Sequence, residues 1–75
     1  MEEQQRKTLE RHFTQAEQVV AQGIEHIGMQ KKLITELIRD GHDAAAATDL
    51  LNTLQQSQKL HVEYLDRLRL ELGLS

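Results

Sequence analysis

Apolar residues recur at alternating intervals of three and four along two segments of the chain. In the first segment the repeating positions are Leu9, Phe13, Ala16, Val20, Gly23, Ile27, Gln30, Ile34 and Leu37. In the second segment they are Ala47, Leu51, Leu54, Gln58, His61, Leu65, Leu68 and Leu72. This spacing is typical of a helix that packs nearly parallel or antiparallel to another helix. We call these positions the inner stripe of each predicted helix.

A turn cluster, Asp40-Gly41-His42-Asp43, separates the two segments. Gly41 suits the left-handed conformation that commonly ends a helix. The carboxylate of Asp43 is placed to accept a hydrogen bond from the first backbone N–H groups of the next helix. Gly73 predicts the end of the second helix for the same reason as Gly41. The predicted bounds are a helix over about residues 3–39, a turn over 40–43 and a helix over about 44–72, in one domain spanning 1–75.

A turn this short makes the two helices antiparallel neighbours, so the predicted fold class is all-α, an antiparallel two-helix hairpin. Counting outward from a turn centred near residue 42 sets Ile27 against about Gln58. The same count sets Gly23 against His61, with an error of about one helical turn. We therefore expect the His61 ring inside the hairpin, in the space left by the missing side chain of Gly23.

Polar residues interrupt the apolar pattern near the middle of the predicted hairpin. Gln30, Lys31, Gln58 and His61 form this predicted polar layer. Buried polar groups can fix the register or the choice of partner at a cost in stability. The alternative interpretation is a pocket for a small ligand, or a metal site built from His26 and His61 across the hairpin. The Glu-x-x-His motif of di-iron bundles does not occur in the sequence.

Composition excludes several classes of function. Twelve acidic and nine basic residues give a net charge of -3, which disfavours nucleic acid as a partner. The chain has no cysteine, nucleophile elbow or phosphate-binding loop, so we predict neither an enzyme nor a cofactor. The sequence contains no run of 18 apolar residues, so we expect no membrane-spanning helix. Residues 1–7 lack the apolar core of a secretory signal. We expect a cytoplasmic protein.

Apolar residues also flank the inner stripes, and a two-helix hairpin alone would leave them in water. They are Val19, Ile24, Leu33, Ile38, Leu50, Val62 and Tyr64. Together they would form an exposed apolar patch larger than the few hundred Å² that is usual for a monomer. We therefore predict that two hairpins pair into a homodimeric four-helix bundle, with a tetramer as the alternative and another protein as a further candidate partner.

Several stretches of the chain, taken together, resemble a known group of proteins. They are Gly23-Ile24-Glu25-His26-Ile27, Arg39-Asp40-Gly41-His42-Asp43, Ala47-Thr48-Asp49-Leu50-Leu51 and Leu60-His61. The group consists of small uncharacterised bacterial proteins expected to form helical hairpins, and the resemblance covers about residues 16–72. In the group, Thr-Thr-Glu follows the last aspartate of the turn, where this chain has Ala44-Ala45-Ala46. The resemblance implies a hairpin and a bacterial origin, and it transfers no functional site.

The sequence thus favours a non-enzymatic, self-associating helical hairpin that acts as a protein-interaction, scaffold or regulatory module. The alternative is a helical bundle that binds a small ligand or a metal through its polar layer.

Overall fold

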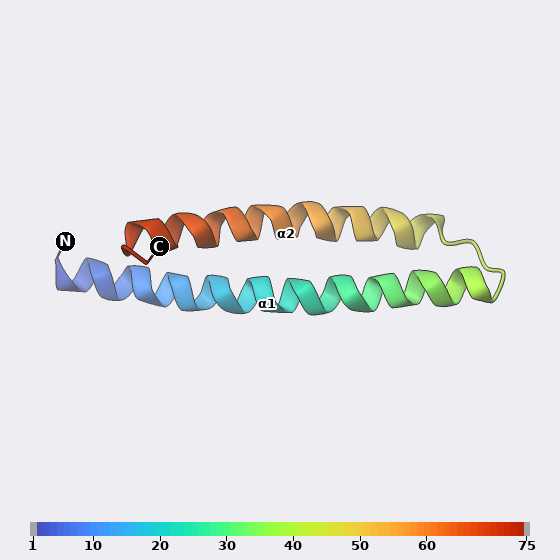
Figure 1. The fold of residues 1–75 in the computed structure, drawn as a ribbon, viewed down its shortest axis with the longest axis horizontal. Coiled ribbons are helices and arrows are strands. Elements are labelled where there is room, and N and C mark those ends of the chain that lie inside the picture. Colours follow the sequence, from blue (N-terminus) through green and yellow to red (C-terminus); the bar gives the residue numbers. More distant parts are fainter. Residues whose placement is uncertain (1, 75) are drawn as a thin grey trace.

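Residues 2–74, which the computed structural model describes, form two long helices lying side by side in opposite directions (Figure 1). Helix α1 spans Glu3–Arg39 and helix α2 spans Ala45–Glu71. The molecule measures 58 × 18 × 14 Å between its outermost Cα atoms. This confirms the predicted all-α antiparallel hairpin. Helix α2 begins and ends one residue inside the expected 44–72.

The turn contains a left-handed glycine, Gly41, as predicted. Gly41 has a φ of 76°. The N–H of His42 donates to the carbonyl of Leu37 at 2.8 Å, and the N–H of Gly41 donates to the carbonyl of Ile38 at 3.1 Å. This pair of bonds is the Schellman motif, which satisfies carbonyls that the end of a helix leaves open.

The end of α2 repeats the Schellman motif at Gly73. Gly73 has a φ of 74°, and the N–H of Leu74 donates to the carbonyl of Arg69 at 2.8 Å. A second bond joins the N–H of Gly73 to the carbonyl of Leu70 at 3.0 Å. The predicted stop signal at Gly73 is therefore confirmed.

The start of α2 depends on an aspartate just before the helix. The N–H of Ala45 donates to Oδ1 of Asp43 at 2.9 Å, as expected. Ala44 occupies the N-cap position and supplies no side-chain cap. Asp43, one residue before the N-cap, therefore satisfies the first N–H of the helix. Its carboxylate accepts the hydrogen bond from the residue two positions later, which is the geometry of an Asx turn.

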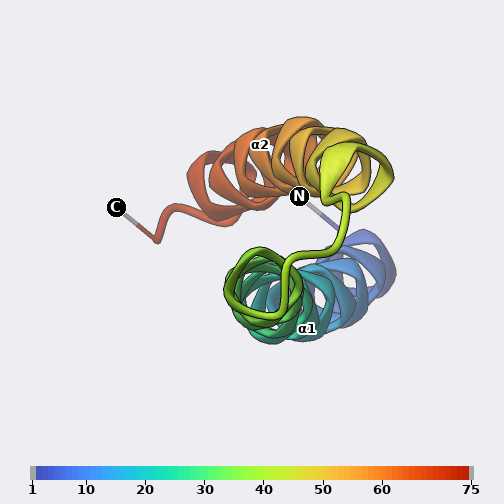
Figure 2. The ribbon, with the colours of Figure 1, turned by 90° about the vertical axis from the view of Figure 1, so that its right-hand side faces the viewer.

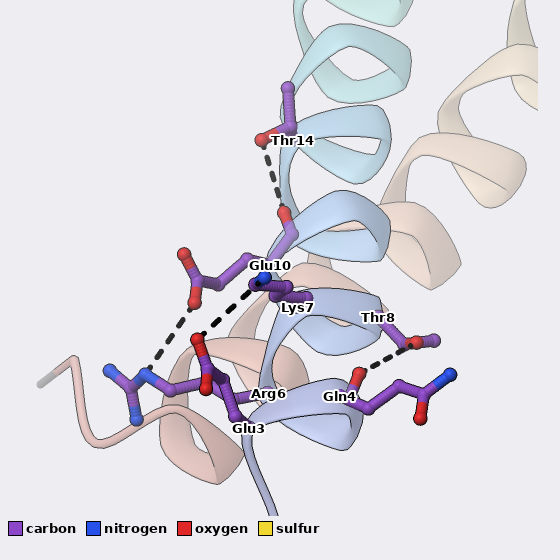
Figure 3. Close-up of polar contacts among 7 residues, drawn as sticks. All are labelled: Glu3, Gln4, Arg6, Lys7, Thr8, Glu10 and Thr14. Atoms are coloured by element: carbon purple, nitrogen blue, oxygen red, sulfur yellow. Dashed lines mark hydrogen bonds and ion pairs between the residues drawn. The ribbon is translucent and has the colours of Figure 1, made fainter.

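The first turns of α1 extend beyond the end of α2 (Figure 1). Their side chains form local pairs along the helix (Figure 3): Lys7 with Glu3 at 3.7 Å and Arg6 with Glu10 at 3.5 Å. Because these groups are more than half exposed, each pair stabilises the helix by only about 0.3–0.5 kcal/mol.

The core is shallow and lies near the open end of the hairpin. Among the residues that the structure describes, the buried ones are Ala16, Leu65, Leu68 and Leu72. Leu9, Phe13 and Val20 pack against this cluster while remaining partly exposed. An end-on view shows why the core is thin, since each helix has only the other as a neighbour (Figure 2). Towards the turn the inner stripe is half-buried at best.

Replacing Gly41 by alanine should destabilise the fold by about 1 kcal/mol, because a Cβ disfavours a positive φ. An added Cβ would meet no atom within 4 Å, so the penalty is one of backbone conformation alone. Gly28→Ala is the matched control: Gly28 lies inside α1 and also has open space around it. This control should gain about 0.5–1 kcal/mol. Urea denaturation at one fixed protein concentration measures both, and equal effects of the two changes would contradict the assignment.

Candidate functional site

Two glutamines of the predicted polar layer reach across the hairpin to the backbone of the opposite helix. Nε2 of Gln30 donates to the carbonyl of Ala47 at 2.8 Å, and Nε2 of Gln58 donates to the carbonyl of Val20 at 2.8 Å. Both side chains are part-buried. A backbone carbonyl has two lone pairs, so it can accept such a bond in addition to its bond within the helix.

The other two members of the predicted layer lie outside it. Lys31 and His61 are both exposed, so the expected buried position of His61 is wrong. Gly23 faces Gln58 rather than His61, about one helical turn from the expected register. The connection runs back alongside α1 before α2 begins (Figure 1). A non-helical residue covers up to about 3.3 Å, whereas a helical residue rises only about 1.5 Å. Counting residues outward from the turn ignores this difference in length, so the count misplaces the register.

The contact between Gly23 and Gln58 is the tightest feature of the layer. A Cβ on Gly23 would lie 2.6 Å from Cδ of Gln58 and closer still to Oε1, so the Gln58 amide occupies the space that a side chain would need. Oε1 is buried and accepts no conventional hydrogen bond within residues 2–74. Because that Cβ would replace a Cα hydrogen of Gly23, Oε1 lies against this hydrogen, and such C–H···O contacts compensate part of the lost hydration.

His26 and His61 line one groove, together with Ser57 and Gln58 from α2. The groove has a volume of about 230 Å³ and also borders Gly23. Both imidazoles are exposed. Within residues 2–74 no group of three His, Cys, Asp or Glu side chains is placed to hold a metal. The two histidines suggested by the sequence are thus neighbours across the groove, without a third ligand from those residue types.

The seven apolar residues expected to flank the inner stripe are all exposed in the single chain. Their exposed fractions range from 36% for Val62 to 65% for Ile24. The remaining five are Val19, Leu33, Ile38, Leu50 and Tyr64. Sequence reasoning missed four further exposed apolar residues: Met29 (63%), Leu60 (65%), Leu70 (71%) and Leu74 (45%). Met29 and Leu60 follow His26 and Ser57, which also flank the inner stripe, by three residues, and this spacing could have revealed them.

No protein-family model, curated protein or solved structure is significantly similar to this chain. The resemblance to bacterial helical-hairpin proteins therefore stays a prediction. In the part of the chain that the structure describes, no helix has both the length and the apolar character that crossing a membrane requires.

A double-mutant cycle tests the packing of Gln58 on Gly23. Gly23→Ala alone should displace the Gln58 amide, and the loss of its hydrogen bond, about 1 kcal/mol, should cancel the gain in helix propensity. In a Gln58→Ala background the same change should stabilise by about 0.5–1 kcal/mol, since the space is then free. Denaturant unfolding of the four proteins gives the coupling energy, which we expect to be on the order of 1 kcal/mol. Additive effects would show that the two residues do not touch.

Proposed function

We propose that this chain is a non-enzymatic helical hairpin whose function is to self-associate, as a homodimeric four-helix bundle that serves as an interaction, scaffold or regulatory module. The observation that supports this most directly is its surface. The single chain exposes 5766 Å². A compact monomer of its mass exposes only about 4,700 Å².

The shape supports the same proposal. The radius of gyration over Cα atoms is 16.9 Å. A compact chain of this length has a radius of gyration of about 11 Å. The excess arises because each helix is covered along one side only (Figure 2). Large apolar residues remain exposed along both helices, from Val19 in α1 to Leu70 in α2.

The area that pairing would bury is large enough for a stable dimer. A compact protein of twice this mass exposes about 7,800 Å². Two separate hairpins expose 5766 Å² each, so reaching compactness would bury about 1,900 Å² per chain. A total of more than about 2,000 Å² is typical of obligate homodimers. Pairing would also give every helix a second neighbour, as in other four-helix bundles.

Sedimentation velocity at low micromolar concentration should show a species of about twice the 8.6 kDa chain mass. The melting temperature should rise with protein concentration, because folding and association are coupled. A species of four chains would identify the tetramer instead. An 8.6 kDa species that stays helical and unfolds cooperatively, with a concentration-independent melting temperature, would contradict the proposal.

The groove between His26 and His61 is the feature that supports a second candidate function, the binding of a metal or a small ligand. Elemental analysis and absorption of protein purified without a histidine tag distinguish the two. If self-association is the function, His61→Leu should leave stability unchanged or raise it, because the exposed imidazole is not part of the core. A stoichiometric metal or chromophore that is lost in His61→Leu would favour the second candidate.

A further inference from the structure

Nine of the eleven large exposed apolar residues, all except Leu70 and Leu74, can be assigned to one of the two broad faces of the hairpin, and they are divided unequally between them. One of these faces points toward the viewer in Figure 1 and the other points away. The groove between the helices joins Val19 and His26 of α1 to Ser57 of α2, so these three residues lie on the same face. A second groove, which joins Met29 and Leu33 to Leu54, shares His26 with the first and continues along that face.

Helical spacing extends this face along both helices. Leu50, Leu60 and Tyr64 lie seven before, three after and seven after Ser57, so they share its side of α2. We define the neutral face by its exposed apolar residues Val19, Met29, Leu33, Leu50, Leu60 and Tyr64. Between them, at the same spacing, stand histidine, glutamine, serine, threonine and Leu54. From 19 to 33 on α1 and from 50 to 64 on α2, these rows carry no Asp, Glu, Lys or Arg, and the first ions that follow them are Glu36 and Arg67.

The opposite face has a different composition. Its exposed apolar residues are Ile24, Ile38 and Val62, and we call it the charged face. Glu17 and Lys31 lie seven before and seven after Ile24 on α1, and Arg69 lies seven after Val62 on α2. The Arg69 guanidinium already lies 5.9 Å from the centre of the Phe13 ring.

Resting on the proposed self-association, we propose that a second copy of this chain docks on the neutral face, while the charged face stays in water. Burying the charged face would desolvate several ions, each at a cost of several kcal/mol unless well paired. Burying the neutral face removes six large apolar side chains from water, and the ions nearest to it, Glu36 and Arg67, lie at its two ends.

The chemistry of the neutral face favours a copy of itself over other occupants. A two-fold interface sets the same patch against itself, and a patch without charges meets no like-charge repulsion there. Binding at a lipid surface uses Lys and Arg on the polar side of a helix, and nucleic acid binding uses them against phosphates. The chain instead has a net charge of -3.

Matched charge substitutions on the two faces test this assignment. Leu33→Glu places a charge on the neutral face, and Ile38→Glu places one on the charged face near the same end of α1. We expect Leu33→Glu to raise the Kd for self-association by about 100-fold, because a buried unpaired carboxylate costs several kcal/mol. Ile38→Glu should change the Kd by less than about threefold. Sedimentation equilibrium over a concentration series gives both values.

Cross-linking supplies a measurement that does not depend on a disruptive variant. The chain has no cysteine, so a single introduced cysteine is unique. Ser57→Cys, near the middle of the neutral face, should give a covalent dimer with a short bismaleimide. Gln55→Cys, two residues away on the side of the charged face, should not, because the bundle would separate its two copies.

The possible results distinguish docking on the neutral face from self-association in general. A larger effect of Ile38→Glu than of Leu33→Glu, or cross-linking through Gln55→Cys alone, would overturn the neutral face as the interface and leave self-association standing. Equal effects of the two glutamate variants would overturn its assignment to one face. A wild-type chain that remains monomeric at about 100 µM would overturn self-association itself, and this inference with it.

Discussion

The rest of this structure depends on one constraint: each helix of a hairpin has a single neighbour, so it can bury a single stripe. Here both helices carry apolar residues on more than one stripe. The inner stripe packs and produces the buried cluster of Ala16, Leu65, Leu68 and Leu72. The other apolar residues have nothing to pack against within the chain. The elongated shape, the thin core and the excess surface are three expressions of the same constraint.

A core this thin specifies register weakly, because leucines spaced by one helical turn are nearly interchangeable. The contact of Gln58 with Gly23, in contrast, can form in only one register. A slip of one turn would set Gln58 against Val20 or Ile27, whose side chains would fill the space that the amide now occupies. The hydrogen bond to the carbonyl of Val20 would be lost with it. One glycine on the inner stripe thus gives the two helices a specific alignment, the role that a buried polar residue can have in coiled coils.

The sequence was sufficient to predict the fold because the signals for it are local. The 3-4 spacing predicts two packed helices, and Gly41, Asp43 and Gly73 predict where they end. The polar layer was only half predictable. A residue count does not measure the length of the non-helical connection, so the count set His61 against Gly23 where the structure has Gln58. The spacing also does not distinguish His61, which is exposed, from Leu68, which lies seven residues later on the same stripe and is buried.

The two candidate functions of the chain compete for the same surface. The groove between His26 and His61 lies within the neutral face, so a second copy docked there would cover it. A ligand bound in the groove of the free hairpin would then lower the affinity of the two chains for each other. Association would lower the affinity for the ligand by the same factor. Linkage of this kind requires no conformational change, because both ligand and second copy need the same groove. The proposed docking face therefore contains a groove whose occupant would regulate the proposed association.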